Sequence, residues 1–325
     1  MAFTSQGGLV SASLDRSLKY WTPDIPSQRP IAEFAGRADP IWVSTYSPNG
    51  KRMFVGGEAH RFELWDLPSG QLMVAKQAHE TIRCAGFYHL GDLLATGGSD
   101  QDVRVWDADS GEEIMTLRGH PGMVSAVVFA PDVMMLISAC DGGVIKLWSL
   151  DNGQGMATLL GHQRQIYCAA ISPDGKRLVT GGGDWTGNVP GELIVWDLAS
   201  AKFVKKVDGH RLAIWAISFS ADVRQIATSS SDGSVKVRDL ATLEVRQTLQ
   251  HTTRVRPMSF SPNGKILAVG RGDGSIRLWD TTTWRQHTSL DGHDGFTFYL
   301  QFGPDGKKLA TAGHDGTVRF WGIDD

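Results

Sequence analysis

Short hydrophobic runs separated by turn residues recur along the whole chain. Residues 119–148 are representative, with three runs of four to seven residues rich in Val, Ile and Phe, separated by Pro, Asp and Gly. Runs of this length between turn residues are typical of β-strands. A fourth run precedes each recurrent His, as at residues 113–117 and 203–207. The pattern predicts repeated groups of four short strands, with no room for a helix.

Two sequence markers divide the chain into repeats. A Trp, usually followed by Asp, ends the third run, and a His, usually preceded by Gly, stands before the first. Both recur every 41 to 48 residues, and the spacing of 48 falls in the same repeat for both, because residues 185–191 are inserted there. Two independent markers that stay in phase identify a tandem repeat. The Trp positions are Trp21, Trp65, Trp106, Trp148, Trp196, Trp279 and Trp321, with Arg238 in the sixth place.

A small four-stranded antiparallel sheet cannot bury both of its faces alone, so neighbouring sheets must stack on one another. Radial stacking of such sheets produces a β-propeller. We therefore predict an all-β propeller with four-stranded antiparallel blades, formed as one domain by residues 1–325. Counting the Trp positions favours eight blades, with the first clipped and the last three-stranded. The alternative is seven blades over residues 31–325, in which residues 31–35 complete the last sheet and close the ring.

The repeated motifs resemble those of a known family. The Gly-His pairs, the Asp-Gly turns and the terminal Trp-Asp pairs appear here as GH…DGTVRFW, GH…WD and SPDGK. They resemble the motifs of the WD-repeat (Trp-Asp repeat) β-propellers, over essentially the whole chain. The resemblance implies the propeller fold and a platform that binds other macromolecules, but it does not specify the partner.

The resemblance also implies a hydrogen-bonded set in each blade: a His before the first strand, a Ser or Thr in the second, an Asp at the next turn and a Trp in the third. Three repeats carry all four residues: His79, Thr96, Asp100 and Trp106; His162, Thr180, Asp184 and Trp196; and His293, Thr311, Asp315 and Trp321. In two other repeats Val269 replaces the hydroxyl and Arg238 replaces the Trp. We expect looser packing or local specialisation there.

A His, a hydroxyl and an Asp could also be interpreted as a catalytic triad, which needs one exposed nucleophile and an oxyanion hole. Here the same constellation recurs several times, each with its hydroxyl inside a strand and covered by a Trp. We therefore predict no catalytic residues and no enzyme. Cys84, Cys140 and Cys168 lack the spacing of metal ligands, so we expect neither a metal site nor a cofactor.

The charge and the cysteine content narrow the function classes further. Thirty-two Lys and Arg against 35 Asp and Glu give a net charge of −3, which argues against a general nucleic-acid binder. No apolar run approaches the roughly 18 residues of a membrane helix, and residues 1–20 lack the apolar core of a signal peptide. Three cysteines are too few for a disulfide framework. These features predict a cytoplasmic protein that does not associate with membranes.

Candidate binding residues follow from the resemblance. In this family one face of the disc carries the loops before the first strands, and alignment places a wider set of residues there that includes Phe296. Those of the types enriched at interface hot spots are the candidates, since Trp, Tyr and Arg dominate such sites. The predicted partner-binding residues are Trp42, Arg83, Tyr167, Trp215, Arg254, Arg256 and Phe298. The Arg residues would suit an acidic or phosphorylated peptide, because guanidinium pairs bidentately with carboxylate and phosphate.

The function predicted from the sequence is that of a non-catalytic scaffold, a monomeric propeller within a larger complex, that binds a protein or peptide through one face. The alternative is a small-ligand or enzymatic propeller that uses the central channel. It needs His or carboxylate residues on the first strands, and these read WVSTYS, CAGF, AVVF, CAAI, AISF and PMSF. A nucleic-acid platform is the third possibility, and a steep salt dependence of binding would favour it.

Overall fold

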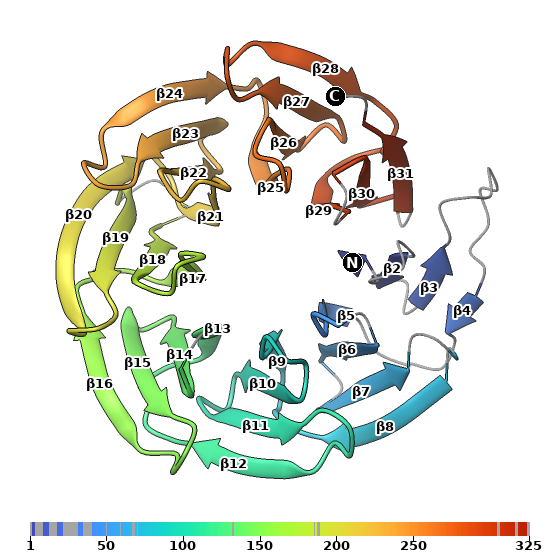
Figure 1. Cartoon of the computed structure of the whole chain (residues 1–325), viewed down its shortest axis with the longest axis vertical. Helices are drawn as coiled ribbons and strands as arrows, with labels where there is room; N and C mark the ends of the chain where they lie inside the picture. Colours follow the sequence, from blue (N-terminus) through green and yellow to red (C-terminus); the bar gives the residue numbers. More distant parts are fainter. Residues whose placement is uncertain are drawn as a thin grey trace. The chain divides into compact units, whose positions relative to one another are not determined.

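The computed structural model consists of β-strands, and the described residues contain no helix (Figure 1). The structure describes residues 2–3, 9–12, 18–21, 32–34, 41–49, 51–58, 60–66, 69, 71–131, 133–184, 186, 189–303, 306–315 and 318–323. Within these ranges no helix is long or apolar enough to cross a membrane. The chain forms two compact units, Met1–Leu160 (unit 1) and Gly161–Asp325 (unit 2). Each unit is described by itself, and the single domain over residues 1–325 stays a prediction.

Unit 1 contains four sheets of four antiparallel strands each, in its described part. The strands are β1 (Ala2–Phe3), β2 (Leu9–Ala12), β3 (Leu18–Trp21), β4 (Ala32–Phe34), β5 (Ile41–Tyr46), β6 (Arg52–Gly57), β7 (Arg61–Asp66), β8 (Gln71–Gln77), β9 (Ile82–Phe87), β10 (Leu93–Gly98), β11 (Val103–Asp107), β12 (Glu113–Leu117), β13 (Val124–Phe129), β14 (Met135–Cys140), β15 (Val144–Ser149) and β16 (Gly155–Leu160).

The pairing of β4 bears on the number of blades. β4 pairs with β3, with Leu18 opposite Phe34. The segment that would complete the last sheet in the seven-blade alternative is therefore part of the first sheet. This pairing agrees with the arrangement of eight sheets, but the number of blades in a closed ring stays a prediction.

Unit 2 contains three four-stranded sheets and a last sheet of three strands, in its described part. The strands are β17 (Ile166–Ile171), β18 (Arg177–Gly182), β19 (Gly191–Asp197), β20 (Lys202–His210), β21 (Ile214–Phe219), β22 (Gln225–Ser230), β23 (Ser234–Asp239), β24 (Val245–Gln250), β25 (Val255–Phe260), β26 (Ile266–Arg271), β27 (Ile276–Asp280), β28 (Gln286–Leu290), β29 (Thr297–Phe302), β30 (Lys308–Gly313) and β31 (Val318–Gly322). The predicted antiparallel four-stranded sheets are confirmed.

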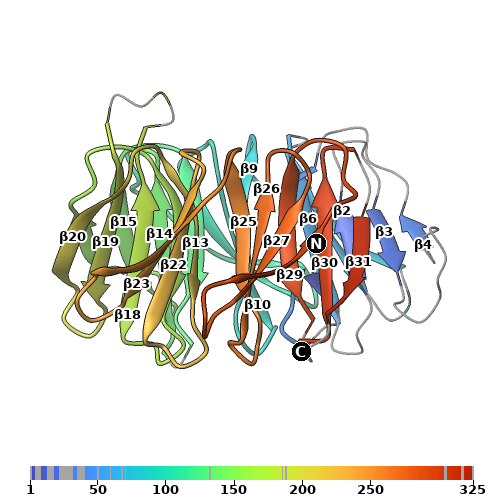
Figure 2. The same cartoon turned by 90° about the horizontal axis from the view of Figure 1, so that it is seen from above.

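Successive sheets within a unit pack face to face. In unit 1, buried side chains of the β9–β12 sheet, such as Val103 and Leu117, join Val124 and Leu136 of the β13–β16 sheet in one hydrophobic cluster. In unit 2, β17, β21, β25 and β29 lie in sequence next to one another. The strands of a sheet run between two opposite ends of their unit, where the turns collect (Figure 2). Each unit therefore presents, at one end, loops from several consecutive sheets.

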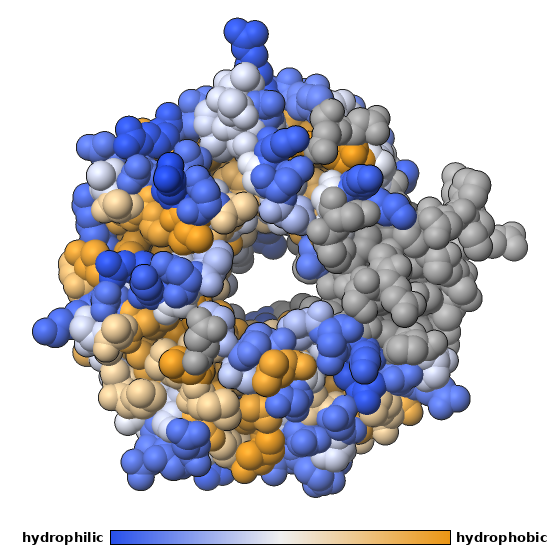
Figure 3. Space-filling model, in the orientation of Figure 1, coloured by the Kyte–Doolittle hydropathy of each residue, from blue (hydrophilic) through white to orange (hydrophobic). Residues whose placement is uncertain are grey.

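Some hydrophobic side chains remain at the surface. On the side of unit 1 seen in Figure 3, apolar atoms are exposed over β13–β16. Val133 and Met134, in the turn between β13 and β14, are among the exposed large hydrophobic residues. Nothing in the described structure covers this turn.

Candidate functional site

Hydrogen bonds join the residues of two of the predicted sets. In the β9–β12 sheet, Trp106 Nε1 donates to Thr96 Oγ1 over 2.9 Å, and Thr96 Oγ1 lies 2.8 Å from His79 Nε2. His79 Nδ1 lies 2.6 Å from a carboxylate oxygen of Asp100. The β29–β31 sheet contains the same chain of contacts, formed by His293, Thr311, Asp315 and Trp321.

The remaining set differs from the prediction at its acidic residue. His162 Nε2 lies 2.8 Å from Thr180 Oγ1, which accepts a bond of 2.9 Å from Trp196 Nε1. His162 Nδ1, however, lies 3.2 Å from Glu192 Oε2. Asp184 accepts bonds from the backbone and the hydroxyl of Thr186 instead, at 2.7 and 2.6 Å. The assignment of Asp184 to this set is therefore wrong.

The insertion over residues 185–191 explains this correction. It lengthens the turn between β18 and β19, so Asp184 contacts the inserted segment rather than His162. Glu192 is the second residue of β19, at the register position that Ser234 takes in the β21–β24 sheet. Its longer side chain binds the backbone N–H of Gln163 over 2.9 Å and Lys206 Nζ as well as His162. These bonds hold the pKa of Glu192 at about 2, although burial alone would raise the pKa.

The sheet with Val269 leaves two polar atoms without partners. His251 Nε2 and Trp279 Nε1 are buried and form no hydrogen bond with any described residue. Their rings meet edge to face, with centroids 5.9 Å apart. Burial and the nearby charge of Arg271 lower the pKa of His251 to about 4, so the imidazole is neutral at pH 7. Because Val269 has no hydroxyl, both His251 Nε2 and Trp279 Nε1 lack the hydrogen-bond partner that a Thr would provide.

Arg238 stands at the Trp position of its sheet and forms different hydrogen bonds from those of a Trp. The side chain is only 5% exposed. Its Nη1 donates to the carbonyl of Leu243 over 2.9 Å, and its Nη2 donates to the carbonyl of Gly209 over 3.0 Å. The guanidinium therefore links β23 to the turn before β24 and to β20 of the preceding sheet, where a Trp would have bonded to Thr228.

The hydroxyl groups of the sets are not available to a substrate. Thr96, Thr180 and Thr311 are fully buried, and each already accepts a bond from an indole N–H. A catalytic nucleophile must be accessible to its substrate. In the described ranges no three His, Cys, Asp or Glu side chains are grouped to hold a metal ion either. The hydrogen-bonded sets therefore stabilise the sheets and do not form the candidate functional site.

All the predicted binding residues except Arg254 share a structural feature that the sequence did not show. Where the first and second strands of a sheet pair, the register shifts at the second residue of the first strand. Tyr167 lies in such a shift, because Ile166 pairs with Gly182 and Cys168 with Gly181. A β-bulge of this kind leaves a residue unpaired and redirects its side chain. The residues at these bulges are Trp42, Arg83, Ser125, Tyr167, Trp215, Arg256 and Phe298.

In unit 2 three of the bulge residues and Phe296 form a continuous stack across four sheets. The ring centroids of Tyr167 on β17 and Trp215 on β21 lie 4.6 Å apart. Arg256 Cζ, on β25, lies 4.0 Å from the centroid of the Trp215 ring. The same carbon lies 5.4 Å from the centroid of Phe296, which directly precedes β29. We call these four residues the aromatic–arginine stack.

Two serines on β22 and in the turn after it hold the stack in place. Trp215 Nε1 donates to Ser231 Oγ over 2.6 Å. Ser229 Oγ donates to the backbone carbonyl of Arg256 over 2.6 Å. Both serines are buried or nearly so. Sequence reasoning did not identify them, because a Ser next to a turn has many ordinary uses.

Arg256 is a cation without an acidic neighbour. It forms no ion pair within the described residues, and its Nε is buried without a hydrogen-bond partner. Burial and the charge of Arg254 lower the pKa of Arg256, which remains a cation at neutral pH. Unit 2 as a whole has 20 Lys and Arg against 17 Asp and Glu, a net charge of +3.

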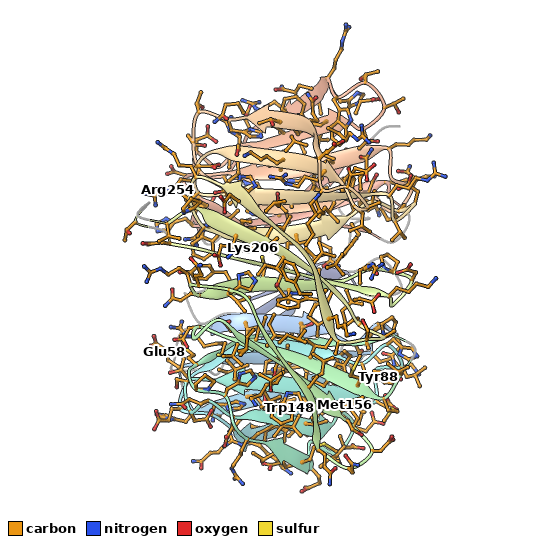
Figure 4. All side chains as sticks on the ribbon, turned by 90° about the vertical axis from the view of Figure 1, so that its left-hand side faces the viewer. Glu58, Tyr88, Trp148, Met156, Lys206 and Arg254 are labelled. Atoms are coloured by element: carbon orange, nitrogen blue, oxygen red, sulfur yellow. The ribbon has the colours of Figure 1, made fainter. Side chains whose placement is uncertain are left out.

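The other predicted binding residues are placed as follows. Arg254 precedes β25, is exposed and extends from one end of unit 2, away from Lys206 on β20 (Figure 4). Arg83 lies in unit 1, where its Nε lies 3.1 Å from Met123 Sδ. The side chains of Trp42 and Phe298 lie outside the described residues. The structure thus brings together Tyr167, Trp215 and Arg256 of the predicted residues and adds Phe296 to them.

Comparison with known proteins gives two kinds of similarity. The family model described as "WD domain, G-beta repeat" matches residues 70–107, 111–149, 153–189, 201–239, 243–280 and 284–322. The crystal structure of the computationally designed Ika8 protein superposes with a TM-score of 0.86 and 26% sequence identity, over 99% of this chain and 95% of that one. The all-β propeller fold is thereby confirmed for the chain.

Two natural relatives illustrate the range of contexts. The U3 small nucleolar RNA-associated protein 15 homolog of Gallus gallus is 32% identical over 40% of this chain and 25% of its own length. The autophagy-related protein 16 of Arabidopsis thaliana is 29% identical over 62% of this chain and 39% of its own length. The chain therefore corresponds to less than half of either relative.

One of these names corrects one sequence-based prediction and leaves another without support. A relative named for a small nucleolar RNA points to the nucleolus, so the predicted cytoplasmic location is contradicted. The same name gives no support to the expectation that nucleic acid plays no part. Composition and charge do not specify where in the cell a protein is located. The net charge of a whole chain also does not report the charge of any one surface.

Proposed function

The chain belongs to the WD-repeat family, and we propose that it is a non-catalytic scaffold that binds a protein segment through the aromatic–arginine stack of unit 2. Proteins of this family bind partners within larger assemblies, and the fold by itself does not select one. The proposal therefore rests on the residues of the surface rather than on the repeats.

One observation carries the proposal: four consecutive sheets each contribute one member of a single stack. Tyr167, Trp215 and Arg256 are partly exposed although they are large, and they are the residue types that dominate interface hot spots. Ser231 and Ser229 hold Trp215 and the Arg256 backbone before any partner arrives. A preorganised aromatic surface loses little side-chain entropy on binding, which favours affinity.

The charges favour an acidic or phosphorylated segment as the partner. Arg254 is exposed beside the stack, and Arg256 has no acidic neighbour within it. Guanidinium groups pair with carboxylate and phosphate through two parallel hydrogen bonds. The net charge of +3 on unit 2 would also attract an acidic segment over a distance of roughly one Debye length, about 8–10 Å.

Nucleic acid is the second candidate partner. A relative is named for association with a small nucleolar RNA, and aromatic and Arg side chains can stack on unpaired bases. The two candidates differ in their salt dependence. Affinity for a nucleic acid falls steeply as the salt concentration rises, because the release of condensed counterions on binding then becomes less favourable.

Replacing Trp215 with Ala is expected to weaken partner binding at least about tenfold, because the central ring of the stack is a hot-spot residue. The measurement is affinity capture with the full tagged chain, followed by titration of the purified captured protein. The matched control is Trp284→Ala, since Trp284 is also partly buried in unit 2 but lies in the turn between β27 and β28. Equal losses for both variants, or no loss for Trp215→Ala, would reject the stack as the binding surface.

A further inference from the structure

We propose that Arg256 recognises one anionic group of the partner with the edge of its guanidinium, whereas Arg254 only adds attraction. This inference rests on the proposed function, because it assigns the chemistry of the group that the stack accepts. The anionic group is a carboxylate or phosphate on a protein segment.

Two aromatic rings contact the guanidinium of Arg256. Aromatic rings from the sheets on both sides of β25 contact the guanidinium, with Cζ 4.0 Å from the Trp215 centroid and 5.4 Å from the Phe296 centroid. The five N–H groups of an Arg lie in the guanidinium plane and point outward from its edge. A ligand that binds the guanidinium must therefore meet its edge with oxygen acceptors.

The edge contains a donor that lacks an acceptor. Arg256 Nε is buried without a hydrogen-bond partner, and no described carboxylate forms an ion pair with this residue. The rings compensate part of the positive charge through cation–π attraction. They provide no oxygen for the N–H groups, and a buried donor without an acceptor is costly. Two oxygens of a carboxylate or phosphate would satisfy two donors of the edge at once.

Arg254 differs from Arg256 in its surroundings. It is exposed and has no aromatic contact or ion pair among the described residues, so a cation of any shape can fulfil its role. Lysine carries the same charge but lacks the planar fork and stacks less well on aromatic rings. Lysine should therefore substitute for Arg254 but not for Arg256.

The geometry favours a protein segment over RNA. Tyr167 already packs on Trp215 at 4.6 Å, and Trp215 already packs on Arg256. The faces that a base would need for insertion are thus occupied by neighbours in the stack. Arg256 is itself partly exposed, and the edge of a guanidinium recognises a single oxyanion rather than a base.

The experiment uses the full chain and four pools of fluorescent nine-residue peptides. The pools have random flanks and a central Glu, phosphoserine, Gln or Ser, and binding is measured by fluorescence anisotropy. We expect the Glu or phosphoserine pool to bind at least about tenfold more tightly than its neutral counterpart. Arg256→Lys should remove this preference, whereas Arg254→Lys should retain it within about threefold. Thermal unfolding of each variant verifies that both are folded.

Three outcomes would overturn the inference. Equal binding of charged and neutral pools, still abolished by Trp215→Ala, rejects anion recognition but leaves the stack as the binding surface. If Arg254→Lys loses the preference and Arg256→Lys keeps it, then Arg254 recognises the anion and the assignment to Arg256 is rejected. Tighter binding of a single-stranded RNA 12-mer than of any pool, with a steep dependence on salt, identifies nucleic acid as the partner.

Discussion

Glu192→Ala is expected to lower the free energy of unfolding by about 3 kcal/mol, because it leaves the buried imidazole of His162 and the partly buried ammonium of Lys206 without their acceptor. Glu192 is 3% exposed and binds His162, Lys206 and the backbone N–H of Gln163. The measurement is urea unfolding of the full chain at neutral pH, followed by the fluorescence of its Trp residues.

Asp184→Ala is the matched control, since Asp184 is the residue that the family motif predicts as the acidic partner of His162. The structure places it on Thr186 in the inserted turn, so we expect little change in stability. A loss for Asp184→Ala as large as that for Glu192→Ala would show that Asp184 is the true partner of His162.

The same carboxylate predicts a pH dependence. The pKa of Glu192 falls from an ordinary 4.5 to about 2 in the folded chain. Because the unfolded chain then binds more protons in this range, the stabilisation by Glu192 is present above pH 4.5 and is lost as the pH falls towards 2. The difference in stability between the wild-type chain and Glu192→Ala should therefore shrink through this window.

Val269→Thr is expected to raise the free energy of unfolding by about 2 kcal/mol, since each buried unsatisfied polar group costs about 1–3 kcal/mol. The new hydroxyl would donate to His251 Nε2 and accept from Trp279 Nε1, which are both buried without partners. Thr311 makes the equivalent pair of contacts in the next sheet. Urea unfolding of the full chain again provides the measurement.

Val237→Thr is the control for this substitution. Val237 is also fully buried, within the core of the neighbouring sheet, where its side chain packs in a hydrophobic cluster. A hydroxyl there would have no unpaired donor or acceptor to bond with, so the substitution should lower the free energy of unfolding. Destabilisation by Val269→Thr of the same size would mean that His251 and Trp279 are not reached by the hydroxyl.

Part of the candidate site could be predicted from the family resemblance together with the residue types. Tyr167, Trp215 and Arg256 occupy equivalent places in successive repeats, and their chemistry marks them as binding residues. The β-bulges that redirect them could not be predicted, because a register shift depends on how two strands pair rather than on either strand alone. For Trp42 and Phe298 the predicted role remains a prediction.

The sequence by itself determined the strands, their grouping into four and the family, because the alternation of hydrophobic runs and turns is a local property repeated many times. Through the family resemblance it also implied the contacts of His79 and His293, whose repeats have the ordinary length. Only the tertiary structure decided that Glu192 replaces Asp184 and that Arg256 lies between Trp215 and Phe296 without an acid. Both facts depend on side chains about 30 to 40 residues apart, whose distance is set by the packing of sheets and not by their order in the chain.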